Sequence, residues 1–120
     1  MKKKRIVAAR SAILALLLSA SPATAHAFLE HASPGAGAKI AVSPDEIALR
    51  FSQALEPALS GVTVTDDAQR RVGKGEPLIE GDSMRIMLMH LAMGSYLVEW
   101  HVVSSDGHRT EGRYRFTVGP

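Results

Sequence analysis

Three residues of this sequence could together hold a metal ion: His26, Asp106 and His108. Asp106 and His108 flank Gly107, and a spacing of i, i+2 places both side chains on one side of an extended segment. A carboxylate oxygen and an imidazole nitrogen would then point the same way. Taken alone, the Asp-Gly-His stretch is better explained by an ordinary turn with an exposed histidine beside it, because Asp-Gly turns are common.

His26 matters because of what precedes it. Positive residues at 2–5, an apolar run at 12–20 and the A-x-A motif at 23–25 have the layout of a secretory signal peptide. The apolar run falls well short of the roughly 20 residues that cross a bilayer, which disfavours a membrane anchor. Cleavage after Ala25 would make His26 the first residue, so that its free α-amine and ring Nδ1 could chelate one metal ion. Cleavage at the rival A-x-A motif, after Ala27, would discard His26.

We therefore expect a cleaved signal peptide at residues 1–25 and one exported domain at residues 26–120. Five of the 14 lysines and arginines, and none of the 12 acidic residues, lie in residues 1–25, which leaves nine against 12 and a net charge of −3. This balance argues against a nucleic-acid-binding protein, which would need a basic patch. No later segment is apolar enough to span a membrane. There are no cysteines, so packing alone must hold the domain together.

The elements that must position these residues alternate with period two, which is typical of strands buried on one face. The alternation is found at residues 47–51, 62–65, 84–89, 96–103 and 113–118. Turn residues separate these segments, and the glycines and proline at 73–81 are expected to break up the middle of the chain. The pattern predicts an antiparallel β-sandwich or barrel. A short helical turn is compatible with residues 54–59.

The donor set indicates which metal would bind. Three nitrogens and one carboxylate oxygen suit a tetragonal site, which favours Cu(II), and copper heads the affinity order for such donors. Zinc is the alternative, because it accepts the same atoms in a tetrahedral arrangement.

Four stretches of the sequence resemble the CopC family of copper-resistance proteins. They are His26-Ala27-Phe28-Leu29 followed by Ser33-Pro34, Gly94 to Trp100, Val102-Val103-Ser104-Ser105-Asp106-Gly107-His108, and Gly112 to Val118. The resemblance implies an immunoglobulin-like Greek-key β-sandwich or barrel of about seven antiparallel strands. It also implies one Cu(II) per chain, held by the amine and ring of His26 and by Asp106 and His108. It further implies a role in copper tolerance or delivery in the periplasm, beside a CopD-type inner-membrane protein.

The methionines depart from the family pattern. Some members of the family carry a Cu(I) site in a loop rich in methionine and histidine, whereas residues 62–71 here contain neither. We therefore expect a variant that binds Cu(II) alone. A different group, Met84, Met87, Met89, His90 and Met93, has donors that suit Cu(I). We favour packing as the explanation, with Met84 filling the core.

Two other classes of protein compete with a copper carrier. A copper enzyme of the N-terminal-histidine type would need a broad substrate-binding face, which a short chain with 5% aromatic residues does not favour. A metal-free immunoglobulin-like interaction module would have no use for a terminal histidine. His31 and His101 are expected to be ordinary surface histidines.

Overall fold

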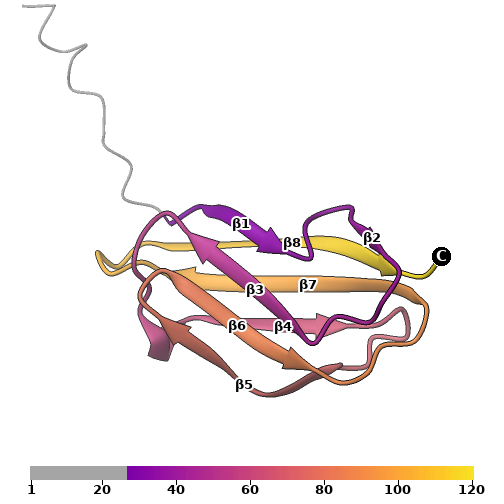
Figure 1. Cartoon of the computed structure of the whole chain (residues 1–120). Helices are drawn as coiled ribbons and strands as arrows, with labels where there is room; N and C mark the ends of the chain where they lie inside the picture. Colours follow the sequence, from indigo (N-terminus) through magenta and orange to yellow (C-terminus); the bar gives the residue numbers. More distant parts are fainter. Residues whose placement is uncertain (1–26) are drawn as a thin grey trace, which may run out of the picture.

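Between residues 27 and 120 the chain forms eight β-strands and one short helical turn (Figure 1). The computed structural model describes residues 27–120, so the predicted signal peptide and His26 lie outside the described residues. The strands are β1 (Leu29–Ser33), β2 (Lys39–Ile40), β3 (Glu46–Phe51), β4 (Gly61–Thr65), β5 (Gly73–Glu80), β6 (Ser83–Leu88), β7 (Gly94–Val103) and β8 (Arg109–Val118).

The strands form two four-stranded sheets, in the orders β1-β3-β6-β5 and β2-β8-β7-β4. The sheets face each other as a sandwich (Figure 1), so the all-β sandwich is confirmed and the barrel is not. The strand count is eight where the sequence predicted about seven. One contact also differs from the antiparallel expectation, because β2 pairs with β8 in parallel.

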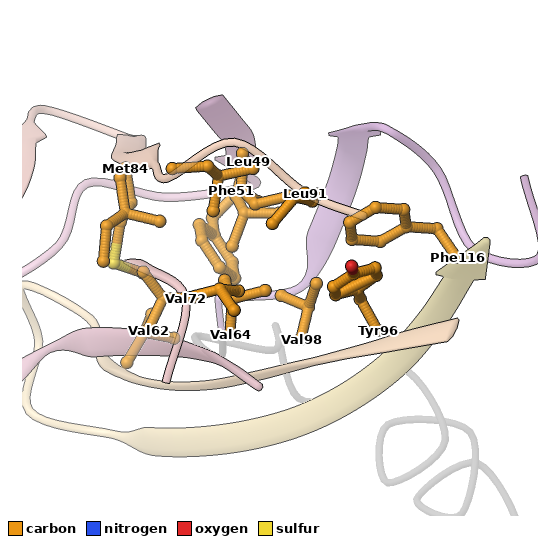
Figure 2. Close-up of a cluster of buried hydrophobic side chains, with 14 of the residues drawn as sticks. Leu49, Phe51, Val62, Val64, Val72, Met84, Leu91, Tyr96, Val98 and Phe116 are labelled. Atoms are coloured by element: carbon orange, nitrogen blue, oxygen red, sulfur yellow. The ribbon is translucent and has the colours of Figure 1, made fainter. Parts of the chain in front are cut away.

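The core lies between the two sheets and is built from the inward positions of the alternating strands. Figure 2 shows side chains from both sheets meeting there. Phe51 of β3 and Met84 of β6 are completely buried, as is Val98 of β7. Burying a side chain of this size stabilises the fold by roughly 1.5–3 kcal/mol before entropy is counted. Since the chain has no cysteine, this packing holds the sandwich together without disulfides.

One strand contradicts the sequence analysis. Residues 73–80 form β5, although their glycines and proline predicted a break. The break is real but local. Lys74 pairs with Met87, and the next pair is Leu78 with Arg85, so the intervening residues bulge out and the strand then resumes. A Cβ at Gly73 would lie 2.7 Å from Cδ1 of Ile86, so a larger residue at the start of this strand would require that buried side chain to shift.

The helical turn is shorter than expected. A 3-10 turn, η2, covers Pro57–Leu59 within the segment 54–59 and begins at the proline, which has the fixed φ that suits a first helical position. None of its residues is buried. Among residues 27–120 there is no helix with the length and hydropathy needed to cross a membrane.

Candidate metal centre

The candidate ligands Asp106 and His108 lie in the tight turn that joins β7 to β8. Backbone hydrogen bonds close this turn, from Ser104 N to His108 O at 2.9 Å and from Gly107 N to Ser104 O at 2.8 Å. Gly107 has a φ of 94°, in the region that glycine adopts at little cost. A third bond, from Ser105 N to Ala54 O at 3.0 Å, fastens the turn to the segment after β3. The turn is therefore anchored to the segment that connects β3 to β4 as well as to its own strands.

The turn brings the two candidate ligands into direct contact. Nδ1 of His108 lies 3.2 Å from Oδ1 of Asp106, and the two side chains are 55% and 36% exposed. The backbone N of His108 also approaches Oδ1, at 3.3 Å. The prediction of an extended segment here is wrong, because residues 105–107 form a turn and a bend. The two side chains nevertheless share one accessible end of the molecule, and their role as ligands stays a prediction.

Ser104 supports this pair and was missed by the sequence analysis. It is completely buried, and its hydroxyl donates a hydrogen bond to Oδ1 of Asp106. This bond is the main reason that the pKa of Asp106 is held below its usual value, with the hydrogen bonds and charge of His108 adding to the effect. The signal was available, since Ser104 continues the inward-facing series of β7 through Val98 and Val102.

His26 lies outside the described residues, but the residue after it is firmly held. Ala27 is completely buried, and its carbonyl oxygen accepts a hydrogen bond from Oγ1 of Thr110 at 2.8 Å. Next to it, Phe28 N donates to Oγ of Ser52 at 2.8 Å, and Ser52 N donates back to Phe28 O at 2.8 Å. Thr110 follows His108 by two residues. The chain therefore enters the sandwich beside the strand that leaves the candidate site.

His31 and His101 lie on strands rather than in this turn. His31 is exposed on β1, opposite Arg50 of β3, as expected for a surface histidine. His101 of β7 is half-buried rather than fully solvent-facing. Its ring packs over Gly61, where a Cβ would lie 3.0 Å from Cε1.

The methionines divide between the core and the surface. Met84 is completely buried, which confirms its predicted role in packing, whereas Met87, Met89 and Met93 are 49%, 44% and 72% exposed. Met87 lies in β6 between Glu46 and Lys74 of the neighbouring strands. Met93 borders Gly119, near the C-terminal end of the chain. That this group forms no Cu(I) site stays a prediction.

Across residues 27–120, no group of three or more histidine, cysteine or acidic side chains is arranged to hold a metal ion. Asp106 and His108 thus form a two-residue cluster, in contact with each other and open to solvent. Such a pair can supply one imidazole nitrogen and carboxylate oxygens, the donors that suit Cu(II) or zinc.

The fold and this turn define the class of small two-sheet β-sandwiches with an exposed Asp-x-His pair at one end. The chain belongs to the CopC family, whose domain matches residues 29–119, and this confirms the resemblance seen in the sequence. Protein YobA of Escherichia coli K12 is 35% identical over 111 residues, covering 89% of this chain and 90% of that protein.

Two solved structures are similar as well. CopC from Methylosinus trichosporium OB3b superimposes with a TM-score of 0.70 at 41% identity, over 79% of this chain and 95% of that one. PcoC from Escherichia coli, described as a methionine-rich copper resistance protein, gives a TM-score of 0.68 at 36% identity, over 78% and 99%.

Proposed function

We propose that this protein is a periplasmic copper-binding protein that acts in copper tolerance, buffering or delivery. It binds one Cu(II) through Asp106, His108 and the α-amine and ring of His26. Family membership supports copper as the metal. The observation that carries the site is the hydrogen bond from Thr110 to Ala27, because it fixes the residue after His26 beside the strand that follows His108. The copper would pass to or from a CopD-type inner-membrane protein.

The reach of His26 is short once Ala27 is fixed. Consecutive Cα atoms are about 3.8 Å apart. His26 is therefore joined directly to Ala27, whose carbonyl oxygen is hydrogen-bonded to Thr110 of β8. The proposed site requires the amine and ring of His26 to turn toward the Asp106–His108 pair. A terminal residue anchored in this way loses little further freedom on binding, which favours chelation.

The burial of Ala27 also supports signal cleavage after Ala25. Cleavage after Ala27 would remove a completely buried side chain and the oxygen that Thr110 binds. It would also turn the N–H of Phe28, which donates to Ser52, into a charged terminus. Cleavage before His26 keeps all of these contacts and frees the amine.

The chemistry of the donors favours Cu(II) over zinc. Two imidazoles, one amine and one carboxylate match the tetragonal preference of Cu(II). Asp106 is prepared for this role, because the hydrogen bond from Ser104 lowers the pKa of its carboxyl and so favours the ionised form that binds a metal. Its charge offsets one of the two charges on the ion, which disfavours Cu(I) at the same site.

We infer a carrier rather than a copper enzyme or a metal-free module. The candidate ligands occupy a small turn with partly exposed side chains, and a chain with 5% aromatic residues offers little surface for stacking against a polysaccharide. A metal-free module would bind no copper at the Asp106–His108 turn, whether or not His26 is present. Copper titration separates these possibilities.

The deciding experiment compares Cu(II) binding by the mature chain that begins at His26 with binding by a chain extended by one glycine. We expect the extension, and equally His26→Ala or His108→Ala, to weaken binding strongly and to change the axial, nitrogen-rich electron paramagnetic resonance spectrum. His31→Ala is the matched control, because that histidine is exposed on β1 and should not matter. Binding should also weaken as the pH falls through about 6.5, where imidazole takes up a proton. Equal affinity and an equal spectrum for the extended chain would refute the proposal.

A further inference from the structure

We propose that Thr110 is the positioning residue that makes the N-terminus a copper ligand, an inference that rests on the proposed function. Its hydroxyl does not contact the metal. It holds the carbonyl of Ala27, and through that peptide it sets where His26 begins.

The geometry of this contact links two sheets. Thr110 is the second residue of β8 and pairs with Val102 of β7, in the sheet that also carries the Asp106–His108 turn. Ala27 lies two residues before β1, which belongs to the opposite sheet. The 2.8 Å bond from Oγ1 of Thr110 to Ala27 O joins them across 83 residues of sequence.

The neighbouring anchor has a different consequence. Ser52 exchanges two hydrogen bonds with Phe28, one through its hydroxyl and one through its backbone. Ser52 directly follows β3, which lies in the same sheet as β1, so these bonds fix the entering chain relative to its own sheet. The Thr110 bond fixes it relative to the strand that leaves His108. It is therefore the contact that relates the two halves of the proposed site.

Loss of this bond should free the terminus without unfolding the domain. Chain ends fray unless they are tied down, and a terminus that moves must be ordered again each time copper binds. Contacts that orient metal ligands without touching the metal typically contribute about tenfold or more to affinity. Because Ala27 would keep its buried side chain, the sandwich itself should persist.

The test uses Thr110→Val, which keeps the shape of the side chain but removes the hydroxyl, and Thr110→Ser, which restores it. Thr117→Val is the matched control, at the far end of the same strand and also half-buried. Cu(II) affinity is measured for each variant with the terminus at His26 and with one added glycine. We expect Thr110→Val to lower affinity about tenfold only when the terminus is free, and Thr110→Ser and Thr117→Val to bind like the parent chain.

The outcomes separate the two claims. If the parent chain binds equally with and without the added glycine, the proposed function fails, and the role of Thr110 fails with it. If the glycine matters but Thr110→Val binds like the parent, only the role of Thr110 is overturned. An equal loss of affinity in both backgrounds would also overturn it, because the effect would then act on the turn or on the fold rather than on the terminus.

Discussion

Replacing Ser104 with alanine removes one buried hydroxyl from beneath the candidate site and little else. The backbone bonds of the turn remain, since Ser104 N still binds His108 O and Gly107 N still binds Ser104 O. Asp106 loses its bond from the hydroxyl but keeps the 3.3 Å contact with the N–H of His108. The fold should therefore survive, while the carboxylate of Asp106 loosens and the carbonyl of His108 loses its 3.3 Å contact with the hydroxyl.

The expected loss of Cu(II) affinity is about tenfold, at the low end of the range for groups that orient a metal ligand. The low end is appropriate because Asp106 retains one of its supports and because only one of the proposed donors is disturbed. Ser105→Ala is the matched control. Ser105 is exposed, and its anchoring bond to Ala54 is made by the backbone, which alanine preserves.

A second measurement on the same variant needs no copper. Ser104 is the main cause of the lowered pKa of Asp106, so Ser104→Ala should raise that pKa toward its ordinary value. An acid whose pKa is lowered by folding stabilises the fold above its unfolded pKa, near about 3.9, and loses this contribution as the pH falls through the lower value. The variant should therefore begin to unfold at a higher pH on acidification. Carboxyl titration by nuclear magnetic resonance checks the shift. Unchanged titration together with parental copper affinity would refute the reasoning.

Three further predictions concern the rest of the molecule. Gly112→Ala should destabilise the fold by about 1–3 kcal/mol through overpacking, because its Cβ would lie 2.5 Å from Cζ2 of Trp100, which packs edge-on against a buried phenylalanine. Urea titration measures this loss. In the same titration Gly61→Ala should lower the free energy of unfolding much less, because its Cβ would meet only the tip of an imidazole, at 3.0 Å. Burial raises the pKa of Tyr114 to about 12, so stability should fall as the pH rises from about 10, where an unfolded tyrosine ionises, toward that value, and Tyr114→Phe should flatten this decline. Competition with bathocuproine disulfonate should show no tight Cu(I) site, and tight retention that is lost in Met87→Leu would contradict this expectation.

The fold was predictable wherever packing on one face determined the residue pattern. Alternation located the long strands, because each buries every second side chain, as Ile47 and Leu49 do in β3. It missed β1, whose side chains are at most half-buried, and β2, which has only two residues. It also missed β5, because a bulge interrupts the period at the glycines and proline that suggested a loop.

The candidate ligands could be picked out from the sequence, whereas the residues that support them could not. Asp106 and His108 are residue types that bind metals, so their spacing drew attention. Ser104 and Thr110 are small polar residues whose importance depends on contacts made in three dimensions, across 83 residues in the case of Thr110. Residue pattern alone could have shown that Ser104 faces inward, but not that its hydroxyl meets a carboxylate.

The contrast between buried supports and exposed ligands bears on what the protein does with copper. Ser104 and Ala27 are completely buried, whereas the side chains of Asp106 and His108 are 36% and 55% exposed. Rigid supports set the geometry in advance, so that binding requires little reordering. If Asp106 and His108 bind copper as proposed, their exposure would leave the ion accessible from one side, so that another protein could take it without unfolding the carrier. The core packs without a metal ion, so copper is not needed to complete it. Removing the metal should therefore leave the sandwich folded and able to bind copper again. A chelator-stripped sample that lost its β-structure would contradict this view and would make copper a structural component rather than a cargo.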